Sequence, residues 1–504
     1  MTSALTGFVP DWLHDRARLS PDRLAIEADG ARLTYLELDA AVDALSAELI
    51  AAGVKPGEIV ALLAQNGAAF ARAVHAVPRA GAVLMPLNLR LTPSELAWQV
   101  SDANAHRILH DATHKDLAIS LREEVVPLEL IDVETPTARL EEFVGRANAP
   151  SSAPGLNLEA LHSVVYTSGT TGRPKGAMLT YGNHLWSATA SALNLGLRPD
   201  DRWLACLPLF HVGGLSILLR SVIYGTTAVI HPGFDPSRVN AAIDNEGITI
   251  VSVVANMLQR MLDEHGGRPY PPSLRCVLLG GGPAPEPLLR RCVEIGVPVV
   301  QTYGLTESAS QVATLAPEDA LRKLGSAGKP LFGAGLRIVD ETGAEFAPGE
   351  PGEIVLRGPS VTPGYLNRPD ETAAAIRDGW LHTGDLGYVD AEGYLYVLDR
   401  RDDLIVSGGE NVYPAEVEAV LQSHPDVAEA GVYGIEDERW GRAPVAVVVL
   451  HDGATADAEA LTAFCRERLA SYKTPQRIEF TRALPRNAAG KLLRNRLSGV
   501  SSNS

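Results

Sequence analysis

The sequence contains few cysteines and few lysines. Its cysteines form no C-x-x-C pair, so we expect reduced, partly buried thiols at all four positions: Cys206, Cys276, Cys292 and Cys465. No internal repeat and no cluster with zinc-ligand spacing occurs. Only seven of the 44 basic residues are lysine. Two of the seven, Lys175 and Lys491, lie in Gly-containing segments, which favours a need for a compact ammonium there rather than a guanidinium.

The sequence also lacks a basic surplus and a long apolar run. Its formal charge is -17 and its pI is near 5.3, which argues against a nucleic-acid or anionic-membrane partner. No N-terminal stretch joins a basic start to an apolar core, and no run approaches ~18 apolar residues. We therefore expect a cytoplasmic protein with no membrane insertion.

The length of 504 residues and the 46% hydrophobic content predict a large core and two or more domains. A capping box at Thr34 and Glu37 begins an amphipathic helix that ends at Gly53. Short apolar strands such as "ITIVSVVA" and "VPVVQTYG" alternate with helical stretches to about residue 340. This alternation predicts α/β layers with parallel strands.

The pattern changes from about Gly335. "GLRIVD", "GEIVLRG" and "GYLYVLDR" are divided by Gly, Pro and Asp turns, which predicts a smaller antiparallel sheet. After a charged segment at Arg400–Asp403, helices near 414–423 and 456–470 alternate with strands, which predicts a compact α+β domain. We predict a large N-terminal domain of several subdomains at 1–401 and a small, mobile C-terminal domain at 402–504.

The segment "VVYTSGTTGRPKGAML" joins an apolar run to a loop rich in glycine, hydroxyls and lysine. Backbone N–H groups, hydroxyls and an ammonium together favour anion binding, although a flexible surface turn is the plainer alternative. The lysine follows proline and precedes glycine, so this is not the P-loop G-x-x-x-x-G-K-[ST]. The predicted phosphate-binding residues are Thr167, Ser168, Gly169, Thr170, Thr171, Gly172 and Lys175.

Four further segments carry candidate chemistry. "LLGGGPAP" and "QTYGLTES" each leave a strand, and Glu307 in the second is either a magnesium ligand or a solvated carboxylate. "WLHTGDLG" places Asp385 in a turn, where it binds a ribose diol or caps an Asx-turn. "PRNAAGKLL" places Lys491 on a loop of small residues, which taken alone is typical of a surface lysine.

Read together in this order, these segments resemble the adenylate-forming superfamily of acyl-CoA synthetases, carrier-protein adenylation domains and luciferases. "LPLFHVGG" and "VLDRRDDLIVSGGENVYPAEVE" add to the resemblance, which covers about residues 160 to 495. It implies the adenylate-forming enzyme fold with ATP, Mg²⁺ and CoA as ligands. A carboxylate would attack the α-phosphorus of ATP, because the resulting mixed anhydride gives a thiol a good leaving group to displace.

The resemblance also implies roles for individual residues. Lys491 would bridge the carboxylate and the α-phosphate, while Glu307 and Thr306 would organise Mg²⁺ and phosphate. Residues that would frame the adenine and bind the ribose are Gly281, Gly282, Thr302, Tyr303, Gly304, Asp385 and Arg400. The C-terminal domain would then rotate about Asp402, as a gate between two reactions. The loop that would then line the CoA tunnel contains Ser407, Gly408, Gly409 and Glu410.

"LPLFHVGGLSILLR" and "DLIVSGGENVYPAEVEAVLQSHPDVAEAGVYGIED" look like segments of the o-succinylbenzoate–CoA ligases of menaquinone biosynthesis. Such a substrate carries an aliphatic carboxylate that is activated and an aromatic one that must be held as an ion. Arg220 is the candidate for the second task, with a structural ion pair or a snorkelling surface arginine as its alternatives. His211 would gate the acyl site, and Ser252 and Asn256 either line that site or pack in the core.

Three rival functions remain open at this point. A general aryl- or medium-chain acyl-CoA synthetase would share the fold and the mechanism, and Arg220 would then be structural. A stand-alone adenylation domain would pass its acyl group to a carrier protein and use free CoA poorly. A nucleotide-binding regulator would bind ATP without releasing pyrophosphate. The resemblance also makes a homodimer an expected assembly.

Overall fold

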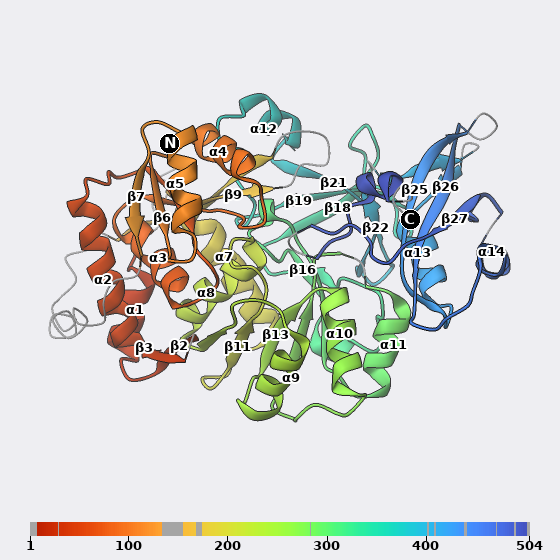
Figure 1. Cartoon of the computed structure of the whole chain (residues 1–504), viewed down its shortest axis with the longest axis horizontal. Coiled ribbons are helices and arrows are strands. Elements are labelled where there is room, and N and C mark those ends of the chain that lie inside the picture. Colours follow the sequence, from red (N-terminus) through yellow and green to blue (C-terminus); the bar gives the residue numbers. More distant parts are fainter. Residues whose placement is uncertain are drawn as a thin grey trace.

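The computed structural model describes residues 8–28, 30–133, 155–167, 174–282, 284–400, 403–407, 410–437, 441–469, 471–487 and 490–500. Two large sheets with their helices form about the first two thirds of the chain, an antiparallel sheet follows, and a small α+β unit forms the C-terminal end (Figure 1). The short strands β1 (Phe8–Val9) and β8 (Leu156–Asn157) pair with each other in an antiparallel two-stranded sheet. The predicted fold class is confirmed.

The first large sheet has six strands. All of its neighbouring strands are parallel except the first two. In spatial order the strands are β10 (Lys175–Thr180), β9 (Leu161–Thr167), β5 (Val83–Pro86), β4 (Ile59–Leu63), β6 (Arg107–His110) and β7 (Glu129–Asp132). Its connecting helices are α3 (Ala68–Arg79), α4 (Pro93–Asp102) and α5 (Lys115–Glu124). Both faces are covered, which is why β4 reads as an unbroken apolar run rather than an alternating one.

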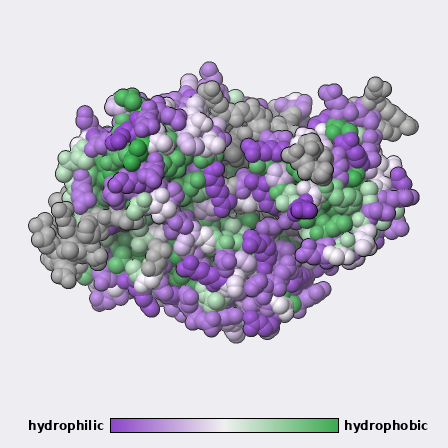
Figure 2. Space-filling view, in the orientation of Figure 1, coloured by the Kyte–Doolittle hydropathy of each residue, from purple (hydrophilic) through white to green (hydrophobic). Residues whose placement is uncertain are grey.

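The second large sheet has nine strands, parallel in its middle and antiparallel at both ends. In spatial order they are β17 (Lys329–Pro330), β16 (Ala313–Thr314), β15 (Val299–Tyr303), β14 (Cys276–Leu279), β13 (Ile250–Val253), β11 (Arg202–Ala205), β12 (Thr227–Ile230), β2 (Leu24–Ala28) and β3 (Ala31–Thr34). Its outer helices are α9 (Pro236–Asn245), α10 (Ala255–His265) and α11 (Glu286–Glu294). Hydrophilic residues predominate along the lower edge in Figure 2, over α9 and α11, as expected for helices with one solvent face.

The largest hydrophobic core holds these two sheets and their helices together. It gathers side chains from both sheets and from five helices: α1 (Trp12–Leu19), α2 (Tyr35–Ala51), α3, α7 (Tyr181–Leu195) and α8 (Val212–Tyr224). The helix α7 packs beside α8. The capping box predicted for α2 is present, since Thr34 accepts from the Glu37 N–H and Glu37 accepts from Thr34. The hydroxyl of Tyr35 donates to the carbonyls of Ser221 and Thr226, which fixes α2 against α8.

A buried ionic cluster lies between α1, α2 and α3. Arg79 contacts Asp11 at 2.9 Å, Asp39 at 2.7 Å and Asp43 at 2.7 Å. The Asp39 side chain is fully buried, and burial raises the pKa of its carboxyl. The Arg79 guanidinium is therefore the main charge that compensates a desolvated carboxylate.

The third sheet is antiparallel and confirms the change of pattern near Gly335. Its strands are β18 (Gly335–Val339), β19 (Gly352–Arg357), β20 (Ile376–Arg377), β21 (Trp380–Val389) and β22 (Leu395–Arg400), with α12 (Pro369–Ala375) beside them. One detail of the prediction is wrong. Asp385 lies within β21, paired with Arg400 of β22, and not in a turn.

The C-terminal unit has its own sheet and its own core. The sheet contains β24 (Glu410–Val412), β23 (Ile405–Ser407), β26 (Gly441–Leu450), β25 (Val427–Asp437) and β27 (Arg477–Phe480). Two helices, α13 (Pro414–Gln422) and α14 (Ala458–Arg466), bury one face of it. The helix α14 is shorter at both ends than the predicted 456–470. Residues 401 and 402 lie outside the described residues, so the domain boundary stays a prediction.

We expect Arg79→Ala to lower the free energy of unfolding by about 3–5 kcal/mol, because it leaves the Asp39 carboxylate buried without its guanidinium. Urea denaturation of the two proteins measures the difference. Arg18→Ala is the control, since Arg18 pairs with Asp15 on an exposed surface and should change stability by less than about 0.5 kcal/mol. A loss below about 1 kcal/mol for Arg79→Ala would contradict the importance of the buried cluster.

Candidate active site

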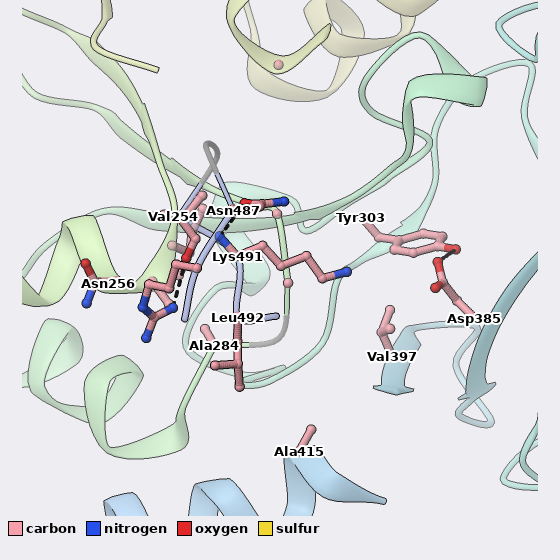
Figure 3. Close-up of a pocket in the computed structure, with 18 of the residues that line it drawn as sticks. Val254, Asn256, Ala284, Tyr303, Asp385, Val397, Ala415, Asn487, Lys491 and Leu492 are labelled. Atoms are coloured by element: carbon pink, nitrogen blue, oxygen red, sulfur yellow. Dashed lines mark hydrogen bonds between the residues drawn. The ribbon is translucent and has the colours of Figure 1, made fainter. Parts of the chain in front are cut away.

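One cavity of about 2660 Å³ lies where the carboxyl ends of β13, β14 and β15 face the C-terminal unit. This is where an open parallel sheet usually binds its ligand. Most of the predicted site residues that the structure describes line it, although they come from distant parts of the chain: Thr167, Lys175, His211, Arg220, Ser252, Asn256, Gly281, Gly282, Thr302, Tyr303, Gly304, Thr306, Glu307, Asp385 and Lys491. Figure 3 shows several of them around the cavity.

The predicted phosphate loop connects β9 and β10, and its residues 168–173 lie outside the described residues. The two residues that flank it, Thr167 and Lys175, are opposite each other in the antiparallel pair. The Lys175 ammonium lies 5.3 Å from the centre of the Tyr365 ring. The hairpin therefore presents both ends of the loop, and one cation, to the cavity.

The glycines after β14 allow a close approach of other chain segments. Gly281 has φ +82°, and a Cβ there would lie 2.9 Å from Cγ1 of Val254, so a larger residue is excluded on both counts. On the neighbouring strand, the Thr302 hydroxyl contacts the carbonyl of Ala313 and the hydroxyl of Thr314. The Thr302 side chain thus helps to pair β15 with β16, and Thr302 is one of the residues that line the cavity.

Asp385 and Tyr303 form a buried pair. The Tyr303 hydroxyl donates to Oδ2 of Asp385 at 2.7 Å (Figure 3). The Asp385 N–H donates to the hydroxyl of Thr383, which itself donates to the carbonyl of Ile354. The carboxylate therefore has a fixed direction at the cavity wall, as a group that accepts from a ribose diol requires.

Glu307 lies in a short 3₁₀ turn, Thr306–Ser308, that follows β15. Among the described residues, Tyr365 is its hydrogen-bonding partner and donates to Oε1 at 2.9 Å, which leaves Oε2 without a donor there. Within the described part of the chain, no group of three or more His, Cys, Asp or Glu side chains is placed to hold a metal. One carboxylate oxygen beside a phosphate site fits Mg²⁺ held mainly through ATP rather than by a protein cage.

Lys491 reaches the cavity from a C-terminal hairpin. Its backbone is fixed by Asn487, whose N–H donates to the Lys491 carbonyl and whose side-chain oxygen accepts from the Lys491 N–H, both at 2.8 Å. The Gly490 N–H donates to the carbonyl of Asn487. In Figure 3 the Lys491 side chain extends across the cavity toward Tyr303. Lys491 is therefore not an ordinary surface lysine, because it lines the cavity.

Arg220 lies on α8 and is 2% exposed. Its Nη2 donates to the Ser187 hydroxyl at 3.0 Å, and its guanidinium carbon lies 5.8 Å from the centre of the Trp203 ring. Its Nε is buried without a partner, and no carboxylate of the described residues pairs with it. Burial lowers the pKa of the guanidinium. Neither a structural ion pair nor a snorkelling surface arginine fits these contacts.

Three other polar groups border the same end of the cavity. The Ser252 hydroxyl accepts from the indole of Trp203 at 2.9 Å, so it is part of the wall around Arg220. Nε2 of His211 is buried without a partner among the described residues, and burial lowers the pKa of this imidazole to about 4. Gln311 is 3% exposed, and neither atom of its amide has a partner there.

Some predicted residues are not brought to the cavity or lie outside the described residues. Ser407 is buried in the C-terminal sheet, opposite Glu410 in the backbone pairing of β23 and β24, and does not line the cavity. The side chain of Glu410 lies outside the described part of the chain. The backbone of Arg400 lies beside Asp385. The predicted residues outside the described part are Ser168, Gly169, Thr170, Thr171, Gly172, Asp402, Gly408 and Gly409.

Sequence reasoning missed the residues that hold these groups in place. Asn487 lies in the quoted segment "PRNAAGK", so its motif was visible although its role was not. Tyr365 and Gln311 carry no local signal, because each meets the site only through the fold. Val254, which packs against Gly281, was equally hidden.

Two models of one enzyme family match the chain in succession. The AMP-binding enzyme model matches residues 13–366, and the model of the AMP-binding enzyme C-terminal domain matches residues 416–491. The chain belongs to the AMP-binding enzymes. The predicted adenylate-forming superfamily is thereby confirmed.

Curated and solved relatives are similar over nearly the whole chain. The 2-succinylbenzoate–CoA ligase of Geobacillus kaustophilus is 54% identical over 490 residues, 97% of each chain. The o-succinylbenzoate CoA synthetase of Bacillus subtilis is 46% identical, and its complexes with the acyl-adenylate OSB-AMP and with ATP and magnesium both align with a TM-score of 0.88. The first complex covers 97% of this chain and 98% of that one, and the second covers 98% and 100%.

A third structure of the Bacillus subtilis synthetase superposes less well on this chain over its whole length. The double mutant bound with the product analogue OSB-NCoA covers 98% of this chain and 99% of that one, but its TM-score is 0.73. This chain therefore has the overall arrangement of the relative's adenylate and ATP complexes rather than that of its product-analogue complex. The position of Lys491 inside the cavity agrees with that arrangement.

The pKa of His211 predicts a specific pH dependence. Burial favours the neutral ring, so between its ordinary pKa of 6.5 and the folded value of about 4 the unfolded state binds more protons at this position. Stability from this residue should be present above pH 7 and be lost as the pH falls below 6.5, by about 2 kcal/mol at pH 5 and about 3 kcal/mol at pH 4. Urea denaturation of wild type and His211→Asn at pH 7.5 and 5 measures it.

The variant should lose less stability than wild type over that interval, because asparagine does not titrate. Equal losses in the two proteins would mean that His211 is solvated and titrates normally. Other buried histidines contribute equally to both proteins, so the comparison isolates this one.

Proposed function

We propose that the chain joins 2-succinylbenzoate to CoA, with ATP converted to AMP and pyrophosphate through an acyl-adenylate. The names of the curated relatives support this substrate, and the bound OSB-AMP of the Bacillus subtilis synthetase supports the intermediate. The substrate is a dicarboxylate whose aliphatic carboxyl reacts and whose aromatic carboxylate stays ionised. Its product would serve menaquinone biosynthesis.

The observation that carries this proposal is that Arg220 is buried and has no carboxylate partner among the described residues. A buried guanidinium without a carboxylate is costly, and a protein retains such an arrangement where a ligand supplies the missing charge. The aromatic carboxylate of 2-succinylbenzoate would pair with Arg220, with the amide of Gln311 near the same end of the cavity. A monocarboxylic acid would leave the guanidinium unpaired.

In the first half-reaction, a succinyl carboxylate oxygen attacks the α-phosphorus and the bond to pyrophosphate breaks. The carboxylate is already ionised at pH 7, so no general base is needed. Lys491, with Lys175 at the phosphate loop, would offset the charge of the carboxylate and the phosphates, while Asp385 and Tyr303 hold the nucleoside end. Catalysis then consists mainly of positioning and charge stabilisation. Glu307 and Thr306 would hold Mg²⁺, which neutralises phosphate charge when bound.

In the second half-reaction, the CoA sulfur attacks the acyl carbon, the bond to the AMP oxygen breaks, and AMP leaves as an anion. Because Ser407 does not line the cavity, we infer that the C-terminal unit rotates before this step, about a hinge at Asp402. Lys491 would then leave the site and the loop at 407–410 would approach. His211 would gate the acyl site between the two steps.

Within the described residues, no helix is both long and apolar enough to span a membrane. The cytoplasmic location and the homodimer stay predictions.

The experiment is CoA- and ATP-dependent pyrophosphate release with 2-succinylbenzoate, benzoate, 4-phenylbutyrate, hexanoate and malonate, together with 4-oxo-4-phenylbutyrate, which lacks only the ring carboxylate. We expect 2-succinylbenzoate to give the highest kcat/KM. Arg220→Met should cost about 2–5 kcal/mol of transition-state stabilisation for 2-succinylbenzoate and much less for 4-oxo-4-phenylbutyrate. The residual activity with the second acid shows that the variant is folded.

Arg290→Met is the matched control, since Arg290 lies on the exposed face of α11 and pairs only with Glu286 among the described residues. It should leave kcat/KM unchanged for every acid. Preference for a monocarboxylate, or equal losses for both keto acids, would mean a general acyl-CoA synthetase. Poor use of free CoA would instead indicate transfer to a carrier protein.

A further inference from the structure

The hairpin that carries Lys491 docks against the junction of β13 and α10. Gly490 has φ +81°, and a Cβ there would lie 3.2 Å from Cγ2 of Val254. The other methyl group of Val254, Cγ1, lies against Gly281. The Val254 side chain is therefore held between Gly281 and Gly490. Figure 3 shows Val254 beside the hairpin that carries Lys491.

A chain of polar contacts joins the same junction to the hairpin. Nδ2 of Asn256 donates to Oε1 of Glu429 at 3.1 Å, across the two parts of the molecule. Nη2 of Arg486 donates to Oε2 of Glu429 at 2.7 Å, and its Nη1 donates to the carbonyl of Gly490 at 2.8 Å. One carboxylate thus receives a donor from α10 on one oxygen and a donor from the hairpin on the other.

We propose that Asn256 and Glu429 are positioning residues that stabilise the arrangement in which Lys491 occupies the cavity. They act on the adenylation step and not on thioester formation. This proposal rests on the proposed two-step function. It also gives Asn256 a role different from the acyl pocket, because its amide nitrogen is already engaged by Glu429.

The Asn256–Glu429 hydrogen bond joins α10 to β25, so it exists only while the C-terminal unit is docked with Lys491 inside. A contact made in one of two arrangements shifts their populations by the free energy of that contact and no more. Glu429 and Arg486 side chains are each 28% exposed, so water competes and the effect is moderate.

A purely structural role for Asn256 makes the opposite prediction for one substitution. Asn256 lies in the first turn of α10, where an aspartate is favoured by the helix dipole. Asn256→Asp should therefore leave the fold as stable as wild type or more so. Under the proposal it is the most harmful change, because it places a carboxylate against Glu429.

The experiment separates the two half-reactions. Formation of the acyl-adenylate is followed by pyrophosphate release without CoA, and thioester formation is followed by mixing the synthetic acyl-adenylate with CoA. We expect Asn256→Ala to slow the first about five- to tenfold and to leave the second unchanged or faster. Asn256→Asp should slow the first by at least about threefold more than alanine does.

Glu429→Gln in the Asn256→Asp background should recover most of the first half-reaction, since the glutamine amide can donate to the aspartate and still accept from Arg486. Gln259→Ala is the control on the same helix, because Gln259 hydrogen-bonds only Asp263 within α10 among the described residues. It should leave the ratio of the two rates at the wild-type value.

Equal slowing of both half-reactions, or tolerance of Asn256→Asp, would overturn the proposal. A raised KM for the acid with an unchanged ratio of rates would also overturn it, in favour of an acyl-pocket role. If instead the proposed substrate is wrong, the result differs, because the wild-type protein itself would then fail to react with 2-succinylbenzoate and with its adenylate. The ratios can then be measured with whichever acid of the panel reacts.

Discussion

The parallel pairing of β13, β14 and β15 is the constraint on which the site depends. Because the three strands run in one direction, their carboxyl ends meet at one edge, so Val254, Gly281 and Tyr303 all line one cavity although Val254 and Tyr303 are 49 positions apart in the chain. Other side chains of the cavity come from elements outside these three strands. The antiparallel sheet brings Asp385, the β9–β10 hairpin brings Lys175, and the C-terminal hairpin brings Lys491.

Two buried arginines differ in whether a carboxylate pairs with them, and this difference distinguishes a structural arginine from one that we assign to substrate binding. Arg79 is surrounded by Asp11, Asp39 and Asp43, so its cost of desolvation is met within the protein. Arg220 has a hydroxyl and an aromatic ring as neighbours but no carboxylate among the described residues. The first arginine holds helices together. The second leaves a positive charge at the cavity that a second substrate carboxylate would complete.

Much of the fold and part of the site could be read from the sequence, for identifiable reasons. The capping box of α2 and the apolar runs of β13 to β15 are local signals, and the glycine-rich and hydroxyl-rich motifs mark nucleotide loops in sequence order. Asp385 was expected in a turn because Thr-Gly-Asp-Leu-Gly has turn composition, but pairing with β22 overrides that preference. Glu429 and Asn256 lie 173 residues apart, and only the packing of two domains brings them together.

The central claim is that a substrate carboxylate attacks the α-phosphorus of ATP in this cavity. Oxygen-18 labelling tests it most directly, with both oxygens of the succinyl carboxyl labelled and all products analysed by mass spectrometry. The account predicts one labelled oxygen in AMP, one in the thioester carbonyl and none in pyrophosphate, because the bridging oxygen leaves with AMP. Label in pyrophosphate or orthophosphate, or unlabelled AMP beside labelled thioester, would contradict it.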